Sequence, residues 1–467
     1  MNAKNRVVVV GLDSLEPSLV FERWRAELPN FGKLMGEGLY GELCSTIPPI
    51  TVPAWMSMFT GHDPGSLGIY GFRNRRDRSY DGLATANSRM VAVPTVWDVL
   101  GSAGLKSVVL GVPLTHPPKP LSGCMVSGFP LPGTDGDYTY PSELKEEIRS
   151  VVGEYMPDVA EFRTDDKKHL IDQVYRMTDC RFALARHLMN TRDWDLFIMV
   201  EMGPDRMHHG FWRYHDSEHP KHEPSSPFAT AIRDYYRYLD DQLGSLLELA
   251  EDAAFVVVSD HGAQCMEGGV CINEWLMREG YLALSSQPEG ITRIDPAVVD
   301  WDRTLAWGDG GYYGRIFLNV RGREPRGVVL PQDYEKVRGE LITGLEAMTD
   351  ESGHPLGTKV YRPEDIYSEC KNIPPDLIVY FGNLRWRSVG SVGHGSIWTR
   401  ENDIGPDDAN HAQNGMIVLS SPGFSGGRSK HAFQICDVAR TLLSILGVDP
   451  PFDMPGKIIK SGERGAV

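Results

Sequence analysis

Short apolar runs alternate along this chain with longer stretches of helical spacing, and this alternation constrains the fold more than any other feature. The candidate strands are residues 7–10, 107–112, 196–200, 255–259 and 416–420. Nearly continuous apolar runs of this length are typical of parallel strands that are covered on both faces. Candidate helices lie at 52–59, 97–103, 230–249 and 432–446. We therefore expect an α/β protein with three layers, in which helices cover both faces of a parallel sheet.

One long segment departs from this pattern. From Gly262 to about Ile404, Gly, Pro and Arg are denser, and short candidate strands at 315–320 and 377–381 are separated by loops. We interpret this segment as an insertion. The expected division is a core made of residues 1–262 and 405–467, and an inserted α+β cap made of residues 263–404.

Charge and cysteine content limit the partners and the compartment. The chain has 467 residues, with 47 Lys and Arg against 63 Asp and Glu, and a net charge of −16. That balance disfavours a nucleic acid or an anionic membrane as the main partner. The seven cysteines form no CxxC pair, the N-terminus resembles a first strand, and no run of eighteen apolar residues occurs. We expect a cytoplasmic protein with reduced cysteines and no membrane span.

Acidic and histidine residues gather next to the candidate strands. They are Asp13 after the first strand, Asp205 and His209 after 196–200, Asp260 and His261 after 255–259, and His411 just before 416–420. In open parallel sheets, ligands bind where the loops at the carboxyl ends of the strands converge. We therefore expect side chains from these distant segments to meet at one edge of the sheet.

A divalent cation is what such a group of side chains needs. Carboxylates placed together repel each other, whereas Asp and neutral His are common ligands of zinc and similar ions. Three Asp and three His provide three protein ligands for each of two ions. Pairs of metal ions recur in enzymes of phosphoryl transfer, because the pair holds the attacking and the leaving oxygen.

Thr51 is the candidate nucleophile. It lies two residues before Pro53, at the expected start of a helix. The free amides of a helix N-terminus attract phosphate, and metal coordination can activate a Thr hydroxyl. The same element can therefore hold a phosphate and provide the attacking oxygen.

Several motifs in the order seen here resemble those of the alkaline phosphatase superfamily, and most closely its type I phosphodiesterase/nucleotide pyrophosphatase branch. The motifs are VVVVGLDSLEP, TVPAWMSMFTGHDPGSLGIYGF, PDRMHHG, SDHG and HAQNGMIVLSSPGF. The resemblance implies an alkaline-phosphatase-type core, two metal ions, usually zinc with manganese as an alternative, and a covalent phosphothreonine. It also implies a small phosphoester substrate, with nucleotides among the candidates.

The resemblance assigns roles to single residues. Asp13, Asp260, His261 and Thr51 match the ligands of one metal, with Thr51 also the nucleophile. The second metal's ligands are matched by Asp205, His209 and His411. His208 and His394 are the rival ligands to His209 and His411, and we rank both lower.

The chain departs from the branch at the position of an Asn that binds a phosphoryl oxygen. Counting from Thr51, that position holds Phe72, followed by Arg73 and Asn74, which become the candidate substrate contacts. Further candidates for a substrate pocket lie in the cap, at Trp307, Tyr312, Tyr313, Arg315, Trp386 and Arg387.

The favoured function is a metal-dependent hydrolase of phosphodiester or pyrophosphate bonds. A phosphomonoesterase on the same site and a non-catalytic metal-binding scaffold stay open as alternatives. A sulfatase is disfavoured, because TVPAW lacks the motif that forms formylglycine. The oligomeric state stays open.

Overall fold

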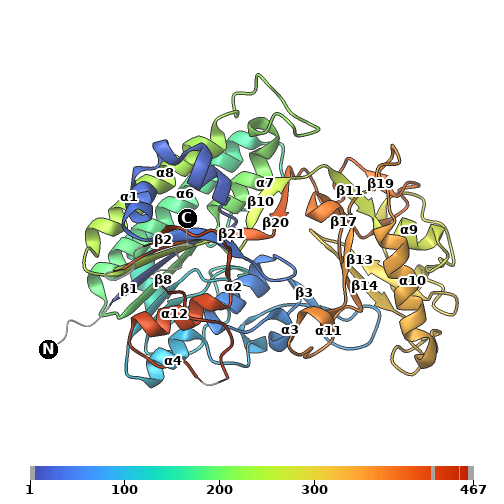
Figure 1. Cartoon of the computed structure of the whole chain (residues 1–467), viewed down its shortest axis with the longest axis horizontal. Helices are drawn as coiled ribbons and strands as arrows, with labels where there is room; N and C mark the ends of the chain where they lie inside the picture. The colour runs from blue at the N-terminus through green and yellow to red at the C-terminus, as the bar shows by residue number, and fades with distance from the viewer. Residues whose placement is uncertain (1–5, 422–425, 452, 461–467) are drawn as a thin grey trace.

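A mixed sheet runs through the larger of two lobes (Figure 1). The computed structural model describes residues 6–421, 426–451 and 453–460, so the two ends of the expected core and Pro422–Phe424 of the last motif lie outside it. Within those residues the sheet has ten strands. In spatial order they are β22 (Gly427–Arg428), β2 (Leu39–Cys44), β21 (Asn414–Ser420), β9 (Ala254–Val258), β1 (Val7–Leu12), β8 (Leu196–Glu201), β5 (Ser107–Leu110), β6 (Gly123–Val126) and β7 (Thr139–Tyr140), with β23 (Phe433–Gln434) beside β2.

The strands expected from the apolar runs are confirmed, but one of them runs in the opposite direction. Strands β9, β1, β8, β5 and β6 are parallel, whereas β21 pairs antiparallel with both β9 and β2. The expectation that 416–420 is a parallel strand was therefore wrong. The chain leaves the sheet after β9 through β10 (Gly262–Cys265) and returns beside it through β20 (Ala409–Ala412), so it re-enters from the carboxyl edge.

Helices cover both faces of this sheet (Figure 1), which confirms the three-layer core. One layer contains α1 (Pro29–Glu37), α5 (Leu144–Val152), α6 (Lys167–Thr191), α7 (Gly203–His215) and α8 (Ala231–Leu249). The other contains α2 (Thr51–Thr60), α4 (Val96–Ser102) and α12 (Asp437–Ile445). Helix α12 begins later than the expected residue 432, because Phe433 and Gln434 pair with β2 instead.

The smaller lobe is built from short sheets and three helices. Its strands are β11 (Gly268–Cys271), β12 (Thr292–Arg293), β13 (Ala306–Asp309), β14 (Gly314–Leu318), β15 (Lys359–Tyr361), β16 (Leu377–Tyr380), β17 (Trp386–Val389), β18 (Ser391–Val392) and β19 (Trp398–Thr399). Its helices are α9 (Ile272–Arg278), α10 (Tyr334–Glu346) and α11 (Pro363–Ile366). Helix α3 (Pro64–Leu67) and the hairpin of β3 (Arg73–Arg75) with β4 (Leu83–Thr85) extend from the core towards this lobe. Short 3₁₀ or π turns occupy Leu19–Arg23, Arg25–Glu27, Ser88–Met90, Pro296–Val298, Pro331–Asp333 and Gly382–Leu384.

Each lobe has its own apolar cluster, and a third cluster joins them. The large cluster surrounds the main sheet, and its centre is the four-valine run of β1, which has no exposed surface. The buried residues of the second cluster lie within 270–397, and Tyr80 packs against them. The third contains Ile50 and Tyr70 from the core together with Tyr312, Tyr313 and Tyr380 from the smaller lobe. The domain boundary at 262/263 and 404/405 stays a prediction.

Two expectations from the sequence concern disulfide bonds and membrane-spanning helices. All seven cysteines are free of disulfide bonds. Among the residues that the structure describes, no helix combines the length and the apolar character that a bilayer crossing requires.

Candidate metal centre and active site

The side chains singled out by sequence meet at the carboxyl edge of the central strands. The elements α2, α7, β10 and β20, which carry or adjoin most of them, lie where the two lobes join (Figure 1). Asp13 directly follows β1, Asp260 and His261 follow β9, and Thr51 is the first residue of α2. Asp205 and His209 lie on α7, and His411 lies on β20. The six Asp and His residues form two buried groups of three, in each of which one ligand atom per residue lies within 4.8 Å of the others.

The first group consists of Asp13, Asp260 and His261. The Nε2 atom of His261 is 3.2 Å from Asp260 Oδ2 and 3.8 Å from Asp13 Oδ1. His261 Nδ1 donates to the carbonyl oxygen of Gly262 at 3.0 Å, which orients the ring with Nε2 towards the carboxylates. Thr51 Oγ1 is 3.5 Å from the same Nε2 atom. The candidate nucleophile therefore borders this group.

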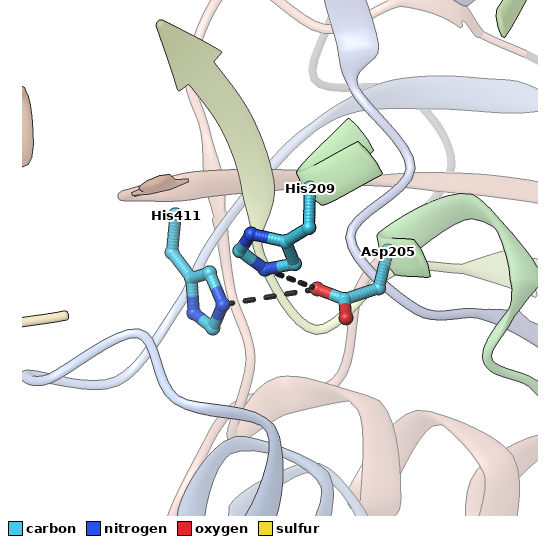
Figure 2. A group of neighbouring side chains, drawn as sticks. All are labelled: Asp205, His209 and His411. Carbon is cyan, nitrogen blue, oxygen red and sulfur yellow. Dashed lines mark ion pairs between the residues drawn. The ribbon is translucent and has the colours of Figure 1, made fainter. Parts of the chain in front are cut away.

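The second group consists of Asp205, His209 and His411 (Figure 2). Both imidazoles point their Nε2 atoms at Asp205 Oδ1, from 3.2 Å for His209 and 3.7 Å for His411. His411 Nδ1 donates to the carbonyl oxygen of Pro49 at 2.7 Å, which fixes the ring. The rings of His411 and His261 stack with centroids 3.7 Å apart, so the two groups are in direct contact.

Each carboxylate in these groups has one oxygen with no hydrogen-bond partner. These atoms are Asp13 Oδ1, Asp260 Oδ2 and Asp205 Oδ1, and all three are buried. A buried carboxylate oxygen is costly unless a donor or a cation compensates it. The three carboxylate oxygens lie near imidazole Nε2 atoms, and carboxylates together with deprotonated imidazoles suit divalent first-row ions. The residues therefore fit two cations.

Burial and mutual repulsion shift the pKa values of the group members in the metal-free chain. Burial, with repulsion from Asp260 and Asp205, raises the pKa of Asp13 well above its usual range. Burial likewise raises the pKa of Asp260 to about 6. Burial also opposes ionisation of Asp205, but His209 and Arg206 outweigh it and hold the Asp205 pKa well below normal. Without a cation, these carboxylates cannot all carry their full charge at neutral pH.

The two histidines of the second group are shifted in opposite directions. Burial and the proximity of His261 lower the pKa of His411 well below its ordinary value. Burial disfavours the charged form of His209 too, but Asp407 and Asp205 more than offset it and raise its pKa to about 9. A cation at this group must therefore displace a proton from His209.

Two supporting residues were missed by the sequence analysis. Trp55 Nε1 donates to Asp13 Oδ2 at 2.6 Å, and Asp407 Oδ1 accepts from His209 Nδ1 at 2.7 Å. Partners of this kind orient metal ligands and set their basicity. Their positions in the sequence could have indicated a supporting role, because Trp55 follows Thr51 by one helical turn and Asp407 precedes His411 by four residues. Gly11 makes room for Trp55, because a Cβ atom at Gly11 would lie 2.5 Å from the indole.

The rival histidines lie outside both groups. His208 is buried with Nε2 at 2.9 Å from the Tyr236 hydroxyl, and burial lowers its pKa to about 3. His394 Nε2 is 2.8 Å from the Ser391 hydroxyl in the smaller lobe. The geometry thus favours His209 and His411 over their neighbours.

Thr51 lies at an N-terminus that can accept an anion. Its N-cap residue, Ile50, makes no side-chain cap, and Pro53 occupies the first turn. The amides of Thr51 and Val52 have no acceptor within the helix, because the first-turn amides never do. Such amides favour a phosphoryl oxygen beside the Thr51 hydroxyl.

A cavity of about 240 Å³ opens above Thr51, Asp205 and His411. It is lined by Phe72 and Arg73 from the core and, of the candidates named in the cap, by Tyr312, Tyr313, Arg315 and Arg387. Trp307 lines a neighbouring cavity, whereas Trp386 lines neither.

Asn74 has its amide engaged elsewhere. Its Oδ1 atom accepts from Tyr70 N at 2.7 Å, and its Nδ2 atom donates to the Gly71 carbonyl at 2.9 Å. Asn74 is 6% exposed and does not line the cavity above Thr51. These contacts hold the turn before β3, and they disfavour the predicted contact between Asn74 and substrate.

Comparisons with known proteins agree with this geometry. The family model described as type I phosphodiesterase/nucleotide pyrophosphatase matches residues 7–409. Human ectonucleotide pyrophosphatase/phosphodiesterase 5 has a similar structure, with 16% sequence identity, 96% of each chain covered and a TM-score of 0.56. An inactive variant of the murine enzyme, solved in complex with AMP, matches with 14% identity, 95% of each chain covered and a TM-score of 0.56. No curated protein sequence matched the chain.

At such low sequence identity, the structural likeness supports only the alkaline-phosphatase-type fold. The assignment of the chain to a family rests on the match to the family model. The match extends over most of the chain and spans the segments that bring Asp13, Thr51, Asp205 and Asp260 together. The chain therefore belongs to the type I phosphodiesterase/nucleotide pyrophosphatase family, a family of metal-dependent phosphoric ester hydrolases.

Proposed function

We propose that this chain hydrolyses phosphodiester or pyrophosphate bonds of a small substrate, with Thr51 as the nucleophile next to two divalent cations. One observation carries the proposal. Two buried groups of carboxylate and imidazole side chains lie beside Thr51, whose Oγ1 atom is 3.5 Å from His261 Nε2, and Thr51, Asp205 and His411 line one cavity. A scaffold protein would have no need to bury three carboxyl groups and three imidazoles together beside a cavity.

The two groups would hold one cation each. Asp13, Asp260 and His261 would bind the first together with the Thr51 oxygen, and Asp205, His209 and His411 would bind the second. Zinc is the favoured ion, because catalytic zinc takes three protein ligands from His and carboxylates and keeps one position open. Manganese is the alternative. When bound, such ions lower the pKa of a coordinated hydroxyl and neutralise charge on phosphoryl oxygens.

Thr51 would form and then lose a bond to phosphorus. Its Oγ1 atom attacks, the bond from phosphorus to the leaving oxygen breaks, and the hydroxyl proton passes to water. The leaving oxygen takes a proton from water as it departs into the cavity. Water then attacks the phosphothreonine, the bond between Oγ1 and phosphorus breaks, and Thr51 regains its proton.

The chain's own groups would orient the phosphoryl group during both steps. The amides of Thr51 and Val52 at the start of α2 are placed to donate to a non-bridging oxygen. Arg73, which lines the cavity, is the candidate contact from the position after Phe72. Aromatic rings of Phe72, Tyr312 and Tyr313 also line it and can stack on a nucleobase. Nucleotides are therefore candidate substrates, as the AMP complex of the murine relative also suggests.

A substrate panel with metal control tests the proposal. Purified protein should release nitrophenol from bis(4-nitrophenyl) phosphate faster than from 4-nitrophenyl phosphate. It should lose that activity with a chelator and regain it with zinc or manganese.

Thr51→Ala should lower turnover by about 10³-fold or more and keep the metal content, because it removes only the nucleophile. Thr60→Ala is the matched control, since Thr60 lies at the other end of α2 and donates to the Met56 carbonyl. Wild-type rates in metal-loaded Thr51→Ala protein would show that Thr51 is not the nucleophile.

A further inference from the structure

Arg387 on β17 is a buried guanidinium with unused donors. The residue is 3% exposed, and its Nε and Nη1 atoms have no hydrogen-bond partner. Its Nη2 atom is 3.7 Å from Asp403 Oδ1, which is beyond hydrogen-bond distance. An arginine stays charged in proteins, so these donors need an acceptor.

Arg387 lines the same cavity of about 240 Å³ as Thr51, Asp205 and His411. Arg387 also lines two neighbouring cavities, so its buried guanidinium lies where these spaces approach the one above Thr51. Burial and the neighbouring Arg163 lower the pKa of the Arg387 guanidinium, although Asp407 opposes them. An oxyanion in the cavity would offset this cost.

The other buried or half-buried arginines around this cavity already have acceptors. Arg206 donates to Asp158 at 2.9 Å from its Nε atom, Arg163 donates to Asp407 at 2.9 Å, and Arg315 pairs with Asp309. Arg387 differs from them because both its Nε and its Nη1 atoms lack an acceptor. A buried guanidinium with free donors favours a carboxylate or a phosphate as its acceptor.

We propose that Arg387 anchors a second anion subsite, and that the natural substrate carries a second oxyanion on the group attached to the reacting phosphorus. The proposal rests on the function proposed above and narrows its substrate class. One end of the substrate is the phosphoryl group beside Thr51, and the other is a phosphate or a carboxylate at Arg387. The small cavity favours a compact substrate of this kind over a long polymer.

Three matched substrates test the subsite. They are 4-nitrophenyl propyl phosphate, 4-nitrophenyl 2-carboxyethyl phosphate and 4-nitrophenyl 2-phosphonoethyl phosphate, which share a leaving group and differ in the terminal group of the arm: methyl, carboxylate or phosphonate. Wild-type protein should hydrolyse at least one charged diester with a kcat/KM about tenfold or more above the propyl diester, mainly through KM. The preferred arm distinguishes a carboxylate from a phosphate.

Arg387→Met should remove most of that preference, and Arg387→Lys should retain part of it, because Lys keeps the charge but lacks the planar guanidinium. Arg385→Met is the matched control. Arg385 lies two residues away, pairs with Glu267 at 2.7 Å and has a side chain 44% exposed, outside this cavity. It should keep the wild-type preference. Equal preferences in wild type, Arg387→Met and Arg387→Lys would overturn the subsite.

A binding measurement distinguishes failure of the subsite proposal from failure of the proposed function. If wild-type protein releases no nitrophenol from any diester, the proposed function is wrong, and calorimetry then decides the subsite alone. Metal-loaded wild-type protein should bind 2-carboxyethylphosphonate or methylenediphosphonate about tenfold more tightly than propylphosphonate, and Arg387→Met should lose that difference. Equal binding of all three ligands by wild-type protein would overturn the subsite as well.

Discussion

Replacing Trp55 by Phe removes one hydrogen bond from a predicted metal ligand and keeps an aromatic ring in the core. Trp55 Nε1 donates to Asp13 Oδ2 at 2.6 Å, and both residues are fully buried. A hydrogen bond to a charged group contributes about 1.5–3 kcal/mol. Loss of such a partner therefore corresponds to about a 10- to 100-fold loss of metal affinity, which is also the range seen when second-layer partners are removed.

The assay is a zinc titration of metal-free protein against a competing chelator. Trp55→Phe should weaken one binding step by about that factor and leave the other within about twofold. Trp97→Phe is the control, because Trp97 is also buried and packs its ring against Phe59 at 5.7 Å between centroids. Urea unfolding of the metal-free variants measures the loss from repacking separately. If both steps in Trp55→Phe match the wild type, Asp13 is not a metal ligand held by Trp55.

Three further predictions concern the support of the two groups and their protons. Asp407→Asn removes the negative charge of the carboxylate that accepts the hydrogen bond from His209. It should weaken zinc binding at the group of Asp205, His209 and His411 by about 10- to 100-fold in the same titration. Zinc binding at pH 7 should release a proton from His209, because the pKa of His209 is raised to about 9, and zinc affinity should therefore rise as the pH rises towards 9. Calorimetry in two buffers of different ionisation enthalpy measures the number of protons released. A zinc affinity that does not change with pH would contradict this prediction. Gly11→Ala should abolish or relocate the indole contact with Asp13, because its Cβ would lie 2.5 Å from the Trp55 ring, and should therefore lower both zinc affinity and the unfolding midpoint.

The convergence of the six predicted metal-ligating Asp and His side chains could be anticipated from the sequence, because each lies next to a strand or in a motif with a fixed place in the fold. Local apolar runs located β1, β8 and β9, and the carboxyl ends of parallel strands share one edge. The direction of β21 could not be anticipated in this way. A run that is buried on both faces has the same pattern in either direction, and the pairing of β10 with β20 decides it.

The supporting contacts depend on distances that no local pattern encodes. Asp407 reaches His209 across 198 residues of chain, and Trp55 reaches Asp13 across 42. The side-chain amide of Asn74 hydrogen-bonds to the backbone of its own turn. The sequence suggested Asn74 only because it lies close to Phe72, and that position does not reveal these hydrogen bonds. The cytoplasmic location and the domain boundaries remain predictions.

The most direct test of the central claim is to trap the enzyme during turnover. Acid quenching of metal-loaded protein within the first turnover of a phosphodiester, followed by peptide mass spectrometry, should find the retained half of the substrate joined through phosphorus to Thr51. An unmodified Thr51 in protein that is turning over the substrate, with the phosphoryl group on another residue or on none, would contradict the account.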